Sequence, residues 1–183
     1  MPVQPSAQAS AEEGPLSASQ LKAWRAFLRA HTVVTRALER ELLAAHRLPL
    51  AEYDVLVQLQ EADGGALRMS QLADRVLLSR SGLTRLVERL ETGGLVRREA
   101  CPSDARGFFA VITDEGRRRL EEAAPSHLSS VHSHFAKPLQ DEQVEALRLA
   151  LEQVAAAMPP GCGSALPDRG AEPPSSGSGA LGA

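Results

Sequence analysis

Hydroxyl and guanidinium side chains gather between residues 79 and 92 of this chain, in a segment whose pattern predicts a helix. At 3.6 residues per turn, its leucine and valine side chains share one stripe and its polar side chains occupy the opposite side. Guanidinium groups and hydroxyls on the exposed side of a helix can contact base edges in a DNA major groove and the flanking phosphates. The candidate contacts on this helix are Ser79, Arg80, Ser81, Thr84, Arg85 and Arg89.

A β-hairpin is predicted directly after this helix. Gly93 and Gly94 end the helix, apolar residues mark strands at 95–99 and 108–112, a polar tip joins the strands, and Thr113 caps the next helix. A cationic side chain near such a tip can enter the narrow, electronegative minor groove beside the helix. The candidate DNA-binding residues of the hairpin are Arg98, Asp104 and Arg106.

Charge is distributed unevenly along the 183 residues, whose formal net charge is −3. Residues 66–120 contain 11 Arg against 7 Asp and Glu, a local net charge of +4, and the remainder carries −7. Because the local field, rather than the total charge, steers a polyanion, the middle third of the chain is the candidate DNA face.

The elements that must position these side chains are mostly helical. A long helix is predicted over residues 17–46, and a second helix follows it and ends before residues 63–65. A short helix begins at Ser70, and residues 77–79 join it to the polar helix with the length of a helix-turn-helix turn. Two amphipathic helices flank Pro138. The predicted fold class is mainly α with a small β-hairpin wing, an α+β arrangement of a winged helix-turn-helix and a helical dimerisation domain.

The terminal helices carry apolar stripes with the 3.5-residue spacing of helices that pack along one another. In the first helix this stripe runs from Leu21 to Ala45. Three such helices offer more apolar surface than a small domain needs, so we expect them to pack across a two-fold axis in a homodimer. A monomeric bundle, in which these helices pack within one chain, is the alternative.

These motifs resemble those of the MarR family of bacterial winged helix-turn-helix regulators, over about residues 17–158. The resemblance implies a triangular homodimer that binds a short pseudo-palindromic operator in double-stranded DNA, usually to repress transcription. It also implies that Arg106 enters the minor groove. Asp104 would hold the wing in shape, by an ion pair with Arg80 or Arg85. The matching segments are Gly94-Leu95-Val96-Arg97-Arg98, Asp104-Ala105-Arg106 and Ile112-Thr113-Asp114-Glu115-Gly116.

The expected domain organisation follows from these elements and from the composition of the ends. Residues 17–48 and 117–158 are expected to form the helical dimerisation region, and residues 49–116 the winged helix-turn-helix domain. Residues 1–16 and 159–183 are rich in Pro, Gly, Ser and Ala, which predicts a disordered N-terminal arm and C-terminal tail.

The resemblance further implies a small effector, often phenolic or anionic, bound between the dimerisation helices and the winged domain. The candidates are polar residues that interrupt the apolar stripe of the first helix, together with aromatic and arginine side chains near them. A residue such as Trp24 is more often part of the core, and one such as His31 is more often a hydrogen-bonded interface histidine. The candidate effector-binding residues are Trp24, Arg25, His31, Thr35 and Tyr53.

Other functional classes find little support in the sequence. No nucleophile–base pair or phosphate loop appears, so neither enzymatic activity nor a cofactor is expected. His127, His132 and His134 do not share one helix face, which argues against a metal site. Cys101 is expected to be exposed on the wing, where oxidation of its thiol would be possible.

No apolar run approaches the length of a membrane span and no signal peptide is evident, so a cytoplasmic protein is expected. The alternative function is a winged-helix protein-interaction module that has lost DNA binding. Such a module would tend to lose the arginines at positions 80, 85, 89 and 106, and all four are present.

Overall fold

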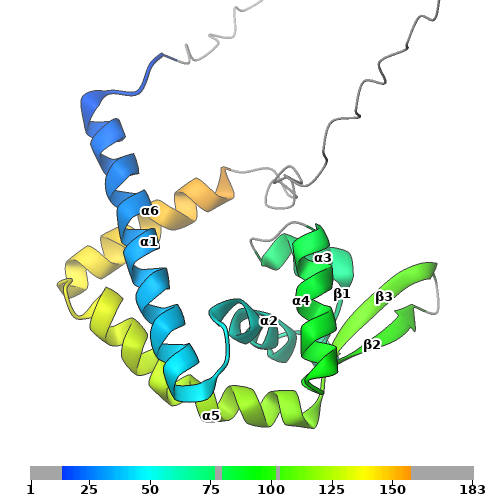
Figure 1. Cartoon of the computed structure of the whole chain (residues 1–183). Coiled ribbons are helices and arrows are strands. Elements are labelled where there is room, and N and C mark those ends of the chain that lie inside the picture. The colour runs from blue at the N-terminus through cyan, green and yellow to red at the C-terminus, as the bar shows by residue number, and fades with distance from the viewer. Residues whose placement is uncertain (1–13, 77–79, 102–103, 158–183) are drawn as a thin grey trace, which may run out of the picture.

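The computed structural model describes residues 14–76, 80–101 and 104–157, and its helices and strands are arranged as Figure 1 shows. None of the helices in these ranges is long and apolar enough to cross a membrane. The elements in chain order are α1 (Ala18–His46), α2 (Leu50–Gln60), a 3₁₀ turn (Asp63–Gly65), β1 (Ala66–Arg68), α3 (Met69–Arg75), α4 (Arg80–Thr92), β2 (Val96–Cys101), β3 (Asp104–Ile112), α5 (Asp114–Val131), a π-helical turn (His132–Ala136) and α6 (Asp141–Ala156).

The hydrophobic core lies where α2, α3 and α4 meet the small sheet and the first half of α5. Its largest side chains are almost completely withdrawn from water, which is the main source of stability for a domain of this size. The largest of the fully buried side chains are Leu48, Val55, Leu56, Leu59, Leu72, Leu83, Leu86, Val87, Leu90 and Val96.

The sheet has three antiparallel strands in the order β1-β3-β2. The sequence predicts only the hairpin of β2 and β3, and the structure adds β1 to it. Three residues give too little alternation to reveal β1 in the sequence, because a strand signal needs about four to eight residues. Leu67 of β1 pairs with Ala110, and Val96 of β2 pairs with Ile112. The strands of the wing also reach closer to its tip than predicted, up to Cys101 and from Asp104.

Cys101 is only 5% exposed, so the expectation of an exposed thiol on the wing is wrong. The strand continues to this residue instead of ending at residue 99, and the thiol is buried there. A buried thiol is shielded from oxidants, which removes the basis for a redox switch at this position.

The predicted long helix is confirmed as α1, and local contacts explain both of its ends. The Ser17 hydroxyl accepts the N–H of Gln20, whose side chain accepts the N–H of Ser17, so each residue satisfies a free donor of the other. At the other end, Arg47 takes a left-handed conformation at φ 52°. The carboxylate of Glu39 then accepts the N–H of Leu50 at 2.6 Å, which fixes the start of α2.

Thr113 ties the base of the wing to α5. Its hydroxyl accepts the N–H of Gly116 at 3.0 Å, as the predicted cap requires, and donates to the carbonyl oxygen of Gly94 at 2.7 Å. A side chain at position 116 would collide with the carbonyl oxygen of Leu95, so only glycine fits this turn of α5. These contacts fix the direction in which the hairpin leaves the helical core.

The terminal helices are far less covered than the core. Leu38 and Leu42 of α1 are buried where α1 packs along α5, but the first half of α1 extends beyond that contact, and α6 has no buried residue. Pro138 separates the last two helices as predicted, after a π-helical turn that the sequence did not reveal. The large apolar side chains left exposed on the terminal helices include Trp24, Phe27, Leu28, Val33, Leu128, Phe135, Val144, Leu149, Leu151 and Val154.

Candidate DNA-binding surface and effector pocket

The two faces of α4 are divided as the sequence predicts. Leu83, Leu86, Val87 and Leu90 are at most 1% exposed and anchor the helix in the core. The opposite face is open to solvent and carries the predicted hydroxyls and guanidinium groups. Its exposed residues are Ser81, Thr84, Arg85, Glu88 and Arg89.

Arg89 is tied to the neighbouring helix while remaining accessible. Its Nε donates to Glu52 of α2 at 3.2 Å, and 60% of its side chain stays exposed. An exposed pair of this kind adds little stability, but it limits the directions in which the guanidinium points. Arg85 lies one turn earlier on the same exposed face.

The hairpin of β2 and β3 lies beside α4 and projects away from α1 and α6 (Figure 1). Arg98 of β2 contacts Glu91 of α4, with its Nε and a terminal nitrogen each 2.7 Å from the same carboxylate oxygen. This contact holds the pKa of Glu91 below its usual range. Arg97, the next residue on the strand, pairs instead with Glu99 at 2.6 Å.

Some predicted contacts cannot be located by their side chains. Ser79 lies outside the described residues. Arg80, Asp104 and Arg106 are placed by their backbone alone, at the start of α4 and the start of β3. The predicted ion pair between Asp104 and an arginine of α4 therefore stays a prediction.

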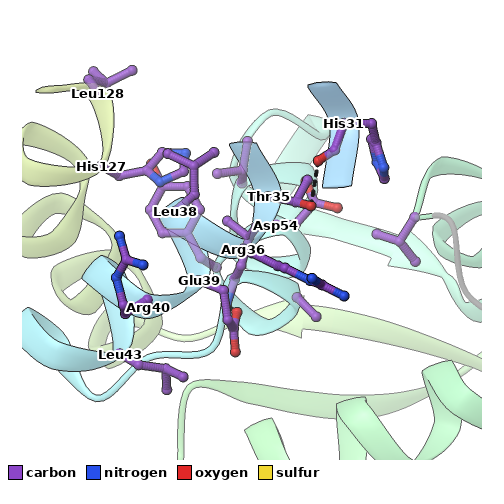
Figure 2. A pocket seen from close by; sticks show the side chains of 15 residues that line it. His31, Thr35, Arg36, Leu38, Glu39, Arg40, Leu43, Asp54, His127 and Leu128 are labelled. Carbon is purple, nitrogen blue, oxygen red and sulfur yellow. Dashed lines mark hydrogen bonds between the residues drawn. The ribbon is translucent and has the colours of Figure 1, made fainter. Parts of the chain in front are cut away.

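A cavity of about 1070 Å³ lies between α1, α2 and α5, on the side where the sequence places an effector (Figure 2). It brings together three of the five candidates, His31, Thr35 and Tyr53, and does not include Trp24 or Arg25. Trp24 is stacked on Phe27, which in turn faces His31 at 6.3 Å between ring centroids. Arg25 lies on another face of α1, beside Lys22 and Arg29.

The cavity wall combines charged, neutral polar and apolar groups. Its polar residues beyond the predicted ones come from three helices and include both signs of charge. The Thr35 hydroxyl is turned back to the carbonyl oxygen of His31 at 2.6 Å, as the dashed line in Figure 2 shows. The additional lining residues that carry a charge or a polar group are Arg36, Glu39, Arg40, Asp54 and His127.

His127 is the residue of this cavity that the sequence did not indicate as an effector contact. Its ring lies 4.3 Å from that of Tyr53 between centroids, and its Nδ1 is buried without a hydrogen-bond partner among the described residues. Burial lowers the pKa of His127 and raises the pKa of Tyr53, so near neutral pH burial favours the uncharged form of both rings. Burial, followed by the charge of Glu61, also raises the pKa of Asp54. Only the place of His127 in the apolar stripe of α5 could have signalled this role.

Known proteins share both the sequence and the architecture of this chain. A family model described as MarR family matches residues 46–107. The transcriptional regulator YkoM of Bacillus subtilis is 30% identical over 66% of this chain and 76% of its own length. A MarR family regulator of Streptomyces coelicolor, solved in complex with DNA, is 38% identical, with a TM-score of 0.74 over 81% of this chain and 93% of its own. The chain belongs to the MarR family.

A second MarR family regulator of Streptomyces coelicolor, AbsC, is also 38% identical, with a TM-score of 0.71 over 78% of this chain and 96% of its own. The matched relatives are transcriptional regulators rather than enzymes. This MarR protein is accordingly a DNA-binding transcriptional regulator with a winged helix-turn-helix, as its motifs predict.

The histidines of the C-terminal region have separate surroundings in this MarR protein. His127 faces Tyr53 in the cavity, whereas His134 lies 2.7 Å from Glu41 at the seam of α1 and the π-helical turn. Among the described residues no three His, Cys, Asp or Glu side chains form a group that could hold a metal ion.

Proposed function

We propose that this MarR protein is an effector-responsive repressor that binds a pseudo-palindromic operator as a homodimer. The observation that carries the proposal is the exposed polar face of α4, which is anchored by four buried apolar residues and stands beside the wing. In this proposal α4 enters the major groove, and Ser79, Arg80, Ser81, Thr84, Arg85 and Arg89 contact bases and phosphates.

The wing completes the proposed DNA contact. Arg106 lies near the tip of the hairpin, from which a guanidinium can reach the minor groove next to the major groove that α4 occupies. Asp104 would hold the tip in shape. Replacing Arg106 by alanine should weaken binding most on operators with A·T-rich flanks, because their minor groove is narrower and more negative.

Dimerisation is supported by the uncovered apolar faces of the terminal helices. Trp24 is 52% exposed, Val33 62% and Val154 60%, which is a large apolar surface for one protomer to leave in water. Residues 17–48 and 117–158 would form the dimerisation region, with residues 49–116 as the winged domain. A two-fold axis would then present two α4 helices to successive major grooves, about 34 Å apart.

The cavity between α1, α2 and α5 supports control by a small molecule. The wall carries Arg36 and Arg40 beside the Tyr53 and His127 rings, which suits a flat, weakly acidic aromatic compound. A panel of hydroxybenzoates is the appropriate probe. Binding should alter Trp24 fluorescence through Phe27 and His31, and the change should disappear in His31→Ala.

DNA binding by the purified protein tests the proposal directly. Duplexes would be selected by the protein from a random-sequence pool, and the affinity for the selected duplex would be compared with that for a scrambled one by fluorescence anisotropy at several salt concentrations. We expect a two-fold symmetric selected sequence, a stoichiometry of two protomers per duplex and a steep salt dependence. Equal, weak binding to both duplexes, or one protomer per asymmetric site, would contradict it. Repression is tested by transcription from a promoter that carries the selected site.

A further inference from the structure

Glu91 at the end of α4 contacts β2, the first strand of the wing, at two places. One carboxylate oxygen accepts Arg98 Nε at 2.7 Å and lies at 2.7 Å from a terminal guanidinium nitrogen. The other oxygen accepts the backbone N–H of Arg98 at 3.3 Å. Glu88, one turn earlier on α4, adds a second negative charge 3.8 Å from the guanidinium. Helix and strand are therefore joined through both the side chain and the main chain of one residue.

The position of β2 explains why a carboxylate is needed there. In the order β1-β3-β2 this strand lies at the edge of the sheet, so one of its sides has no neighbouring strand to pair with its N–H groups. Glu91 accepts one of these donors. The planar guanidinium of Arg98 adds charge-assisted hydrogen bonds with a fixed direction, which a flexible ammonium group does not provide.

We propose that Glu91 and Arg98 are positioning residues that hold the wing at a fixed angle to α4, an arrangement called the clamp below. The Arg98 guanidinium acts through Glu91 and does not contact a phosphate. This inference rests on the proposed binding of DNA by α4 and the wing together. The helix and the hairpin must reach two adjacent grooves at once, so the angle between them decides whether both can bind. The Arg98 side chain is 33% exposed, and two carboxylates already lie within 4 Å of its guanidinium.

The clamp and simple electrostatics predict opposite results for Glu91→Ala. Removing a negative charge beside the DNA-binding face should tighten binding to a polyanion if charge alone matters. If Glu91 holds the wing, the same substitution weakens binding. Glu88→Ala is the matched control, because it removes the same charge from the same helix without breaking the close contacts with Arg98.

The experiment measures anisotropy of the full chain on the duplex selected by the wild-type protein, at several salt concentrations. We expect Glu91→Ala and Arg98→Ala each to weaken binding by about tenfold, the effect of losing a charge-assisted hydrogen bond that fixes a contacting element. Any charged contacts that a displaced wing loses are lost in both variants, so the slope of log affinity against log salt should be the same in Arg98→Ala as in Glu91→Ala. The double variant should be no weaker than either single one, since both substitutions open the same clamp.

Further variants separate the clamp from a general loss of folding. Arg98→Lys keeps a charge for phosphate but loses the fork, so it should weaken binding as Arg98→Ala does. The Arg97 side chain pairs with Glu99 of its own strand and does not contact α4 among the described contacts, so Arg97→Ala should not reproduce the effect. Melting temperatures near that of the wild type would show that each variant is folded. In the Glu91→Ala background, Arg106→Ala should cost less affinity than in the wild type, because the wing is already displaced.

Three outcomes would overturn the clamp. These are a salt slope that falls about 0.9 further in Arg98→Ala than in Glu91→Ala, which marks a lost phosphate contact of Arg98 itself, full affinity in Arg98→Lys, and unchanged or tighter binding in Glu91→Ala. Failure of the wild-type protein to select any duplex would instead contradict the proposed function, so the two failures are distinguishable.

Discussion

The winged region and the terminal helices of this MarR protein differ in how completely each covers its own apolar surface. In the winged region, Val55, Leu56 and Leu59 are fully buried against side chains of the same chain. In α6 no residue is buried, and Val154 is 60% exposed. The hydrophobic effect is proportional to the apolar area removed from water, so packing within the chain stabilises the winged region far more than it stabilises α6.

Polar contacts differ between the wing and α6 in the same way. Around the wing they connect different elements, such as Glu91 with Arg98 and Thr113 with Gly94. On α6 they stay within one helix, where Arg148 pairs with Glu145 and Glu152. Contacts between elements fix the relative positions of α4 and the wing, which the proposed DNA contact requires. Contacts within one helix do not fix the position of that helix relative to the other elements.

The largest expected effect is the loss of stability when a core side chain of the winged region is shortened. Leu56→Ala should lower the free energy of unfolding by about 2–5 kcal/mol, because the lost side chain leaves a cavity that the surrounding residues fill only in part. Val154→Ala on the exposed face of α6 should change the unfolding free energy of an isolated protomer by less than about 0.5 kcal/mol. Urea denaturation at low protein concentration measures both. Similar losses in the two variants would remove the distinction between the regions.

The second prediction tests what covers α6. Val154→Glu should weaken protomer association by at least about tenfold, since a carboxylate would have to be buried in an apolar interface. Sedimentation equilibrium measures the dissociation constant. Gln153→Glu introduces the same charge at the neighbouring position and should matter less. If Val154→Glu leaves association intact, α6 does not contribute its apolar face to the dimer, and the exposed surface needs another explanation.

The third prediction compares arginines of the two regions. Arg85→Ala on the exposed face of α4 should reduce the salt dependence of DNA binding by a slope of about 0.9, as expected for one lost phosphate contact. Arg148→Ala on α6 removes the same charge far from the proposed DNA face and should leave the slope unchanged. Equal effects of both variants on the slope would mean that only the net charge of the protein matters.

The sequence predicts the winged region well because its signals are local. The apolar stripe of α4 and the Thr113 cap each depend on neighbours within about one helical turn, and both are confirmed. The exposed side of α4, with Arg85 and Arg89, follows from the same stripe. Strand β1 was not predicted because its three residues are too few to show an alternating pattern. In the structure they pair in register with β3.

Contacts between distant segments could not be predicted in the same way. Glu91 and Arg98 are seven residues apart, but their pairing depends on the angle at which the hairpin leaves α4. Tyr53 and His127 meet only because α2 and α5 pack together. Cys101 was expected on the surface because the strand was predicted to end two residues before it. Each of these depends on tertiary packing, which the periodicity of residues within one element does not reveal.

The smallest expected effect concerns the polar seam between α1 and the end of α5. Glu41 accepts hydrogen bonds from Ser130 at 2.6 Å and from His134 at 2.7 Å, and these contacts lower the pKa of its carboxyl. Because the folded state then binds the proton less tightly than the unfolded state, the contribution to stability is present above the usual glutamate pKa of about 4.3 and is lost as pH falls through the lower folded value.

Since Ser130 is the largest cause of the shift, Ser130→Ala should lower the melting temperature slightly near pH 5, and the difference from the wild type should shrink toward about pH 3. Ser133→Ala, which removes a hydroxyl bonded only within its own helix, is the control. A difference that grows as the pH falls would mean that the seam is stabilised by the protonated carboxyl, contrary to the direction of the shift.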